Sequence, residues 1–533
     1  MSIYAAGVLV SIVVFVLIGA YAGMKVKGID DYYVCGRNAP TLFITCTLFA
    51  SMLSTNGFMG DTAFSYGGNI TTMLLLNTLC AGGYVIGGLF FGRYIRRAMV
   101  NTMPTYFSNR FNSLRIRRLA AMITVASLFA YLISVLQGTG LLMETLTGYS
   151  RITCLLIAWV GITLFTFYSG ARGSVLTDTV MCLFFLGITI FAGPYVFEAA
   201  GGLENLLDTL ARNPETPPGL LDYHGNPRGG SEFDMVFYGI TMGIIWLVTV
   251  TVAVSPWQAG RNLMARNEHV ILRSSVMMAL LTVIFLLYLY LRSISVIPVN
   301  PAMDQPEKVM IWAAMELMPP LVGVALLAGI LTAGLTSACT FLSVVGFSLS
   351  SDILNIKFAS EKSQLRFTRG MMLLVSLLSL MIASMDMASI RVIAWFASTI
   401  IAASWGYVAF ASVWSKKLTE RGAYLAMAGG FFGYMVAKLL KELAGVPLVN
   451  LFDPFFIGVA ISIVLGIWGS KGQTKTIEEI TYQDKIHQIP ASETVAAEYV
   501  RSRYYGWIMV AAGVLVSTFL IYYWAIPYNV LLN

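Results

Sequence analysis

Residues 329–353 read GILTAGLTSACTFLSVVGFSLSSDI and set a row of hydroxyl side chains into an apolar background. Thr332, Thr336, Thr340 and Ser343 are separated by four, four and three residues, so they share one helical face, and Ser337 lies beside them. A lipid-facing helix would carry apolar side chains at these positions. The stretch therefore predicts a helix inside a bilayer whose hydroxyl face contacts protein, an ion or a solute.

The whole composition agrees with a membrane protein. Of the 533 residues, 57% are hydrophobic and 11% charged, and the mean hydropathy is +0.75. A water-soluble core cannot bury that much apolar surface, so we expect an all-α polytopic membrane protein and not a nucleic-acid-binding one. The predicted spans, about fourteen in number, are 4–24, 40–66, 72–96, 119–146, 152–169, 174–200, 235–257, 271–297, 319–351, 370–386, 388–414, 422–440, 452–469 and 506–527.

The basic residues predict the orientation. Seven arginines fall in the loop 93–118, and placing that loop in the cytoplasm also collects most other Lys and Arg there. Both termini are then expected outside the cytoplasm, in a plasma membrane or bacterial inner membrane. The first span has no basic residue ahead of it and no small-residue cleavage site, which favours a retained helix over a signal peptide. The inner segment 470–505 is predicted to be a solvated linker.

Two predicted spans are interrupted by residues that break helices. The second contains Ser, Thr, Asn and Gly within residues 51–60, and the seventh ends at Ser255 and Pro256. Such segments are tolerated in a membrane where their backbone lines a cavity or contacts protein. The two spans are five apart, so spans 2–6 and 7–11 enter the membrane from opposite sides. Paired interrupted helices in two inverted halves indicate the central site of a transporter.

Other functional classes lack their motifs. The sequence has no glycine-rich loop ending in Gly-Lys-Ser/Thr, which disfavours an ATP-driven pump. No nucleophile and base are paired within the predicted spans, so we do not expect an enzyme. The six cysteines lie in spans or in the first inner loop, and the three histidines lie in loops, which predicts neither a structural disulfide nor an organic or zinc cofactor.

Thr336 and Ser337 are the hydroxyls best suited to hold sodium. This hard cation takes several oxygen ligands, and hydroxyls of one helix together with carbonyls freed by a broken helix would provide them. The alternative is hydrogen bonding within the helix, from Thr336 to Thr332 and from Ser337 to Ala333. Sequence alone leaves both open.

Several motifs carry a family resemblance. The stretch LTAGLTSACTFLSVVGFSLSSDI resembles the ninth-span signature of the sodium/solute symporter family, in which a hydroxyl pair lies sixteen residues before a helix-ending Asp, as Thr336 does before Asp352. The segments DDYYVCGRN, YSGARGSVLTD and WQAGRNLMARNEH also match, in the same order, over about the first 370 residues. The family includes sodium-coupled carriers of proline, sugars, sialic acid and pantothenate.

The resemblance implies a LeuT-type core of two inverted five-helix repeats within a single transporter domain of residues 1–533. The first repeat would be 40–200 and the second 235–414, with 1–39 and 415–533 peripheral. It also implies a sodium site between the second and ninth spans and an aspartate on the sodium release pathway, Asp178. Carried over by position, the sodium ligands would come from Ala50, Leu53, Ala333, Thr336 and Ser337. For Asp178, a carboxylate in the first turn of a helix is an equally good explanation.

The substrate site is predicted less sharply. Met52 stands where many members of the family carry Asn or Asp, and SPWQAGR departs from the usual pattern after the seventh span. No Lys or Arg falls at mid-membrane depth, which favours a small neutral, zwitterionic or monoanionic organic solute. Candidate binding residues are Ser54, Thr55, Asn56, Phe58, Gln137, Trp246, Thr249 and Thr251, with Tyr131 and Trp257 as further candidate walls.

The sequence thus predicts a sodium-coupled importer that works by alternating access, and we expect it to function as a monomer. Two alternatives remain open. One is a transporter-like sensor that binds solute without moving it, and the other is a proton-coupled carrier that uses Asp178 and Glu144.

Overall fold

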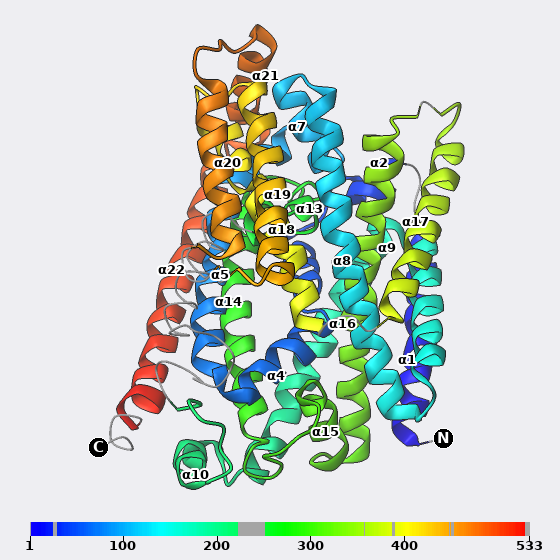
Figure 1. Cartoon of the computed structure of the whole chain (residues 1–533), viewed down its shortest axis with the longest axis vertical. Helices are drawn as coiled ribbons and strands as arrows, with labels where there is room; N and C mark the ends of the chain where they lie inside the picture. Colours follow the sequence, from blue (N-terminus) through cyan, green and yellow to red (C-terminus); the bar gives the residue numbers. More distant parts are fainter. Residues whose placement is uncertain are drawn as a thin grey trace.

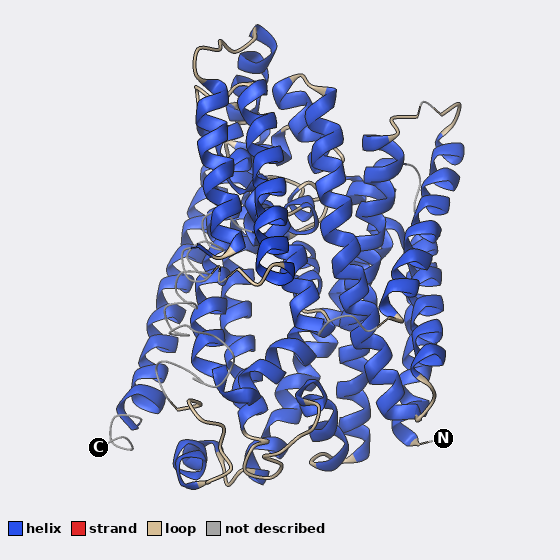
Figure 2. Cartoon of the chain, in the orientation of Figure 1, coloured by secondary structure: helices blue, strands red, loops and turns tan. Residues whose placement is uncertain are grey.

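The computed structural model of the chain describes residues 2–24, 29–221, 251–356, 358–385, 390–446, 448 and 452–527. Within these ranges the ordered backbone is helical (Figure 2), and the β contact between Ala39 and Ala265 is a lone bridge. The all-α class expected from composition is therefore confirmed.

The helices fall into two groups by length. The long ones are α1 (Ile3–Gly23), α5 (Ile70–Gly87), α8 (Leu114–Thr147), α9 (Arg151–Ala199), α14 (Glu268–Ile294), α16 (Pro320–Phe347), α17 (Glu361–Ala383), α18 (Ile390–Trp414), α19 (Glu420–Leu443), α20 (Pro454–Ser470) and α22 (Ala496–Leu520). The short ones are α2 (Ile29–Val34), α3 (Thr41–Met52), α4 (Thr62–Phe64), α6 (Arg93–Arg97), α7 (Met103–Phe111), α10 (Leu206–Arg212), α12 (Thr251–Val254), α13 (Pro256–Asn262), α15 (Val309–Glu316) and α21 (Ile477–His487).

Ten helical segments among the described residues are long and apolar enough to cross a membrane. Three shorter apolar helices cover Thr41–Met52, Arg151–Phe167 and Pro454–Ser470. The predicted span 235–257 lies mostly outside the described residues, so the count of fourteen stays a prediction. The backbone of α9 is helical through both the fifth and the sixth predicted spans, where the sequence suggested a loop between them.

Polar side chains fix where several long helices begin. Ser113, Asn267, Ser360 and Thr419 each accept a hydrogen bond from the backbone N–H three residues later, at the first turns of α8, α14, α17 and α19. These bonds satisfy donors that the first helical turn leaves without an internal partner. Gly148 ends α8 with a φ of 70°, a left-handed conformation that glycine adopts without a steric penalty.

The helices pack around α8, α9 and α16. These three contact one another in the middle of the bundle, α1 packs against α9 and α16 on one flank, and α5 packs against α14 on the other (Figure 1). Small residues allow the close approaches. A side chain on Gly87 would meet Ala253 of α12, and side chains on Gly429 and Gly433 of α19 would meet Leu465 and Ile461 of α20. Glycines at four-residue spacing therefore serve helix packing.

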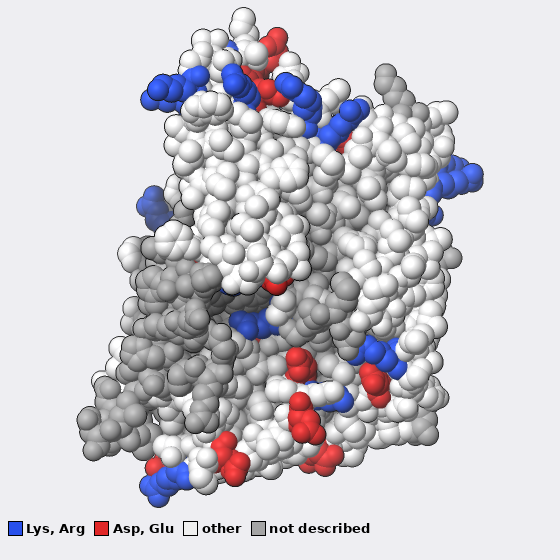
Figure 3. Space-filling model, in the orientation of Figure 1, with Lys and Arg blue, Asp and Glu red and all other residues white. Residues whose placement is uncertain are grey.

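The two ends of the bundle differ in charge. Lys and Arg gather at the upper end of the face in Figure 3, which carries α7 and α21 and is called the basic end below. The opposite end carries α10 and α15, and α1 begins and α22 ends there (Figure 1). The start of α1 and the end of α22 therefore lie at the same end of the bundle, away from the basic end.

The segment predicted to be a solvated linker is docked on the protein instead. Arg97 donates hydrogen bonds to the carbonyls of Ile486 and His487, at 3.1 and 3.3 Å, and Arg110 donates to the carbonyl of Glu479 at 3.3 Å. The side chains of Glu479 and Ile486 are buried. Burial and the nearby Arg110 charge lower the pKa of Lys475 to about 8. Most residues of the segment are still exposed, as a solvated linker would be, but arginines from a loop almost 400 residues earlier fix its backbone in place, which the sequence did not indicate.

Candidate functional site

The second predicted span is broken, as its polar residues indicate. Helix α3 ends at Met52, Leu53 is extended with φ −79° and ψ 90°, and a π-helical segment, η2 (Asn56–Asp61), follows. At the break the amide of Ser54 donates to the carbonyl of Met52 at 3.1 Å. It therefore does not bond the carbonyl of Ala50, which a continuous helix would require.

The carbonyl released from α3 meets the hydroxyl stripe of α16. Ser337 Oγ donates a hydrogen bond to Ala50 O at 3.0 Å, across the contact between the two helices. Both residues are buried, with exposures of 0% and 6%. The structure thus brings together two of the five residues predicted to hold sodium.

The other three predicted ligands lie next to this contact. Thr336 and Ala333 occupy adjacent turns of α16, and Thr336 Oγ1 reaches Ala333 O at the long distance of 3.4 Å. Leu53 lies in the break itself, three residues after Ala50, and its amide still bonds Phe49 O at 2.9 Å. The group therefore consists of backbone carbonyls and hydroxyls at a helix break, which is the donor set that sodium prefers.

The remaining hydroxyls of the stripe behave differently. Thr332 donates to the carbonyl of Ala328 at 2.6 Å and Thr340 to that of Thr336 at 3.1 Å, each four residues earlier in the same helix. Ser337 makes no such bond to Ala333 and crosses to α3 instead. Hydrogen bonding within the helix was the alternative raised for Thr336 and Ser337. It describes Thr332, Thr340 and the long contact of Thr336 with Ala333, but not Ser337.

Thr55, which follows the break, packs closely against two glycines of neighbouring helices. A Cβ on Gly138 of α8 would lie 2.6 Å from the Thr55 side chain, and one on Gly334 of α16 would lie 2.9 Å from it. Neither position has room for a larger residue without a shift of Thr55. Within the described residues, Thr55 Oγ1 and both polar atoms of Gln137 are buried without a hydrogen-bond partner.

A cavity of about 90 Å³ lies beside the break and is called the central cavity. This is room for several water molecules or a small solute. Its lining comes from eight helical segments and the break after α3: Ser51, Met52, Ser54, Asn56, Asp61, Met73, Leu76, Asn77, Cys80, Ala81, Tyr84, Tyr131, Trp257, Gln258, Thr282, Phe341 and Trp395.

Only part of the predicted substrate set lines this cavity. Ser54 and Asn56 do, as do the candidate walls Tyr131 and Trp257. Thr55 and Gln137 lie at the glycine contact described above, and Phe58 is fully buried against Phe185 and Phe285. Trp246 and Thr249 lie outside the described residues. Thr251 is the first residue of α12, and nothing of its side chain is described.

The sequence reasoning missed one cavity residue with a charge. Asp61 ends the π-helical segment and lines the central cavity. The signal was present, because an acidic residue inside a membrane span is costly and marks function more often than packing. It was overlooked because the run of Ser, Thr, Asn and Gly before it already explained the interruption of the span.

The second interrupted segment contributes from the other side. Ser255 is extended between α12 and α13, and its Oγ accepts a hydrogen bond from the amide of Gln258 at 3.2 Å. Pro256 follows at the first position of α13, where its missing N–H costs nothing. This turn places Trp257 and Gln258 in the central cavity, and Ser51 of α3 lies 3.4 Å from Gln258 Oε1.

Three aromatic rings cluster in the wall of the central cavity, and one of them also lines a second pocket. Trp257 and Tyr131 have ring centroids 5.1 Å apart, and Phe341 lies 5.9 Å from the Trp257 ring and 5.1 Å from the Tyr131 ring. Trp257 lines both pockets. We call Tyr131, Trp257 and Phe341 the aromatic partition.

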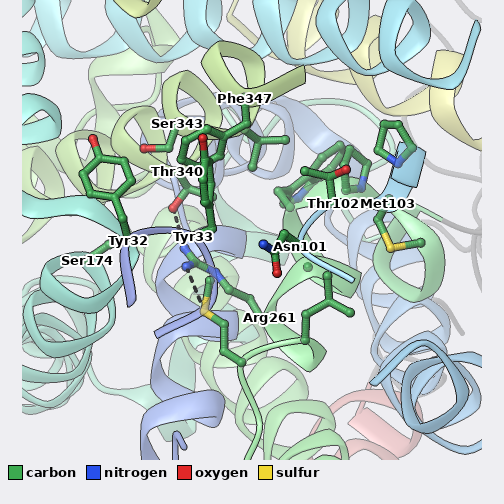
Figure 4. A pocket seen from close by; sticks show the side chains of 17 residues that line it. Tyr32, Tyr33, Asn101, Thr102, Met103, Ser174, Arg261, Thr340, Ser343 and Phe347 are labelled. Carbon is green, nitrogen blue, oxygen red and sulfur yellow. Dashed lines mark hydrogen bonds between the residues drawn. The ribbon is translucent and has the colours of Figure 1, made fainter. Parts of the chain in front are cut away.

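The second pocket lies on the side of the basic end and contains the C-terminal part of the stripe. Thr340 and Ser343 of α16 line it together with Arg261 of α13, and Figure 4 shows Arg261 reaching toward Thr340. From the same pocket Arg261 contacts Asp178 of α9, whose Oδ2 lies 3.3 Å from the guanidinium. We call this the basic-end pocket.

Asp178 is held by groups from several elements. Besides Arg261, its Oδ2 accepts hydrogen bonds from Thr47 of α3 and, at 3.4 Å, from Ser174. Asp178 and Arg261 are 1% and 3% exposed, so this is a buried ion pair. The ion pair connects α9 with α13, and the hydrogen bond from Thr47 connects α3 with α9. The role of Arg261 was not predicted, although the motif that contains it was recognised.

Asp352, the residue at the end of the sixteen-residue spacing, has a structural position. Its Oδ1 accepts from Arg117 Nε at 2.8 Å and from the hydroxyls of Thr102 and Thr105 at 3.2 and 3.0 Å. Sixteen helical residues span roughly 24 Å, so Asp352 lies far from Thr336. It anchors the end of the helix to α7 and α8.

Comparisons with known proteins show the family of this chain. The family model described as "Sodium:solute symporter family" matches residues 32–430. The sodium/pantothenate symporter of Haemophilus influenzae is 22% identical over 85% of this chain and 93% of its own length. The osmoregulated proline transporter OpuE of Bacillus subtilis is 23% identical over 78% of this chain and 85% of its own length.

Other relatives are matched over less of their length. The uncharacterized symporter YhjB of Bacillus subtilis is 23% identical, and the match spans 60% of this chain and 64% of that protein. Among solved structures, a Na⁺-coupled sialic acid symporter in a substrate-bound outward-open state has a TM-score of 0.73 at 16% identity, covering 89% of this chain and 99% of the other. At that identity the likeness concerns the fold. The match to the family model over most of the chain shows that this transport protein belongs to the sodium:solute symporter family.

Proposed function

We propose that the protein is a sodium-coupled symporter that imports a small organic solute across a cell membrane by alternating access. The observation that carries the proposal is the contact of Ser337 Oγ with the released carbonyl of Ala50 at the break of α3. Carbonyls of Ala50, Leu53 and Ala333 and hydroxyls of Thr336 and Ser337 would hold the ion. The central cavity beside the break would hold the solute.

The two interrupted helices support a pair of inverted repeats. In this proposal residues 40–200 form the first repeat, residues 235–414 the second, and the remaining helices are peripheral. The breaks at Leu53 and at Ser255 then occupy corresponding positions, and both face the central cavity. Binding sites in transporters of this architecture lie where two such breaks meet.

Alternating access requires barriers that open in turn. In this proposal the aromatic partition is the barrier between the central cavity and the basic-end pocket. Beyond it, the Asp178–Arg261 pair joins α3, α9 and α13. Sodium leaving the Ser337 contact toward the basic end would pass Asp178, as the release pathway predicted from the sequence requires. For an importer, sodium leaves into the cytoplasm, so the basic end is the cytoplasmic side and both termini are extracytoplasmic.

The driving force is sufficient for accumulation. Moving one positive charge through 100 mV provides about 2.3 kcal/mol, and a tenfold sodium gradient adds about 1.4 kcal/mol. One sodium ion per neutral solute could therefore sustain an accumulation of several hundredfold. In this proposal the protein acts as a monomer in the bilayer.

Uptake into proteoliposomes tests the proposal. Radiolabelled solutes are offered with an inward sodium gradient, and potassium replaces sodium in the control. We expect uptake that depends on sodium and falls when Ser337 is changed to Ala. Solute binding without uptake would identify a sensor, and uptake unchanged in potassium would identify another coupling ion.

A further inference from the structure

The carboxylate of Asp61 lies at the central cavity without a bonded partner. Its Oδ1 is buried and accepts no hydrogen bond from the described residues. Ser65 Oγ donates to the backbone carbonyl of Asp61 at 3.0 Å and leaves the carboxylate alone. A buried charge of this kind is costly unless a cation or several donors meet it, and the cavity is the side from which they can come.

The polar groups near Asp61 are also acceptors. Asn56 Oδ1 is buried without a partner one turn away. Asn77 lines the same cavity, and its amide group is engaged, because Nδ2 donates to Met73 O at 3.0 Å and to the Tyr290 hydroxyl. A solute that enters this part of the cavity therefore meets oxygen atoms that accept hydrogen bonds.

Aromatic side chains make up much of the rest of the cavity lining. The rings of Tyr84, Tyr131, Trp257 and Trp395 line it, together with that of Phe341. Aromatic faces attract weakly hydrated cations such as organic ammonium groups. Sodium, by contrast, needs several oxygen ligands at short range, which a wall of rings does not supply. The combination of a carboxylate and aromatic rings discriminates in favour of an ammonium group.

Arg391 lies close to this end of the cavity but does not neutralise it by contact. Its guanidinium carbon lies 3.4 Å from the Phe64 ring centroid and 4.0 Å from that of Trp395, and its Cβ packs against Gly60. Among the described residues Arg391 and Asp61 are not joined by an ion pair. The Arg391 guanidinium therefore contacts the Phe64 and Trp395 rings and acts on Asp61 only through space, while Asp61 lines the cavity.

We propose that the central cavity binds its solute through an ammonium group that faces Asp61 and packs against the rings of Tyr84, Tyr131, Trp257 and Trp395. The substrate class is then small organic cations and zwitterions, including amino acids and betaines, and excludes neutral polyols and simple carboxylates. This inference rests on the proposed function in one respect, that the central cavity is the solute site.

Matched pairs of probes test the ammonium group directly. Choline is compared with its neutral isostere 3,3-dimethylbutan-1-ol, glycine betaine with 3,3-dimethylbutanoate, and L-alanine with L-lactate. Thermal unfolding of the purified full-length protein is measured in sodium with each probe, because a ligand that binds the folded state raises the melting temperature. We expect at least one ammonium compound to raise it and its partner to leave it unchanged.

Variants assign the effect to Asp61. Asp61→Asn keeps the shape of the side chain and removes its charge, and we expect it to weaken binding of the ammonium probe on the order of 100-fold. Asp208→Asn, on the exposed helix α10 and paired with Arg212, serves as the matched control and should bind normally. Stabilisation of Asp61→Asn by sodium alone shows that the variant remains folded.

Several results would overturn the inference. An uncharged or anionic partner that stabilises the protein as well as its ammonium counterpart would do so, as would the absence of a shift with all three ammonium compounds. Loss of sodium cooperativity in Asp61→Asn, with ammonium binding intact, would make Asp61 an ion ligand instead. Sodium-driven uptake of a sugar alone would leave the symporter proposal standing and remove this one. Ammonium binding without any uptake would leave this inference standing and remove the symporter proposal.

Discussion

One carboxylate lines the central cavity and another contacts Arg261 of the basic-end pocket, and the two carboxylates are bonded in opposite ways. Asp178 has an arginine and two hydroxyls on its Oδ2, whereas no described donor bonds the carboxylate of Asp61. A charge that is paired within the protein serves the structure or its movements. A charge left facing a cavity is available to a ligand. Trp257 of the aromatic partition lines both regions.

The largest expected effect separates the two carboxylates by stability. Asp178→Asn leaves the buried Arg261 guanidinium without its counter-charge, which should lower the free energy of unfolding by about 3 kcal/mol. Asp61→Asn breaks no contact among described residues and should leave the melting temperature unchanged or raise it. Thermal unfolding of both variants in detergent, with sodium and no solute, checks the difference. Equal destabilisation by the two changes would show that Asp61 contributes to stability as Asp178 does and is not left free for a ligand.

A double variant sharpens the same point. Arg261→Gln added to Asp178→Asn removes both charges, and it should recover a large part of the lost stability. The recovery would show that the cost in the single variant came from an unpaired charge and not from a change in packing. No recovery would assign the cost to the packing of α13.

The next effect concerns the aromatic partition. Trp257→Ala removes the ring that borders both pockets, so we expect a several-fold rise in sodium flux without solute across proteoliposomes. Trp257→Phe keeps an aromatic ring and serves as the control. Tight coupling retained in Trp257→Ala would mean that the Asp178–Arg261 pair closes the path by itself.

A smaller effect is expected at the hydroxyl pair. Ser337→Ala removes the hydroxyl that bonds Ala50 O, and the sodium concentration for half-maximal stabilisation should rise about tenfold. Titration of the melting temperature with sodium, in the absence of solute, measures this. A change in solute preference at constant sodium affinity would move Ser337 to the solute site.

The smallest effect is expected on the same helix one turn away. Thr332 bonds only the carbonyl of Ala328 within α16, so Thr332→Val, which keeps the shape, should change sodium affinity by less than about twofold. The same titration applies. If Thr332→Val weakens sodium binding as much as Ser337→Ala, the two kinds of hydroxyl do not differ in function.

Much of this architecture could be predicted because it depends on local patterns. Hydropathy located α1, α8, α14 and α16, and Ser255–Pro256 and the polar residues after Ser51 located both breaks. Hydroxyl spacing and family resemblance pointed to Ser337, but only the structure shows it bonded to Ala50 and not to its own helix.

The failures have a common physical cause, which is contact between distant segments. Arg261 lies in a recognised motif, yet its pairing with Asp178 depends on how α13 packs against α9. Asp61 was read as part of an interrupted span because its exposure to a cavity is set by α5, α8 and α18. The docking of α21 depends on Arg97 and Arg110, whose partners no local pattern can identify.

Docked helix α21 has a practical consequence for handling the protein. Its contacts with Arg97 and Arg110 fasten the chain between α20 and α22 to the ends of other helices, so an epitope tag or a fluorescent domain inserted within residues 477–487 would displace them. The exposed residues Gln488 and Ile489 offer a gentler insertion point. A protease site placed there would be cut while α21 stays bound, so the two halves of the chain would remain joined through the contacts of α21 with Arg97 and Arg110.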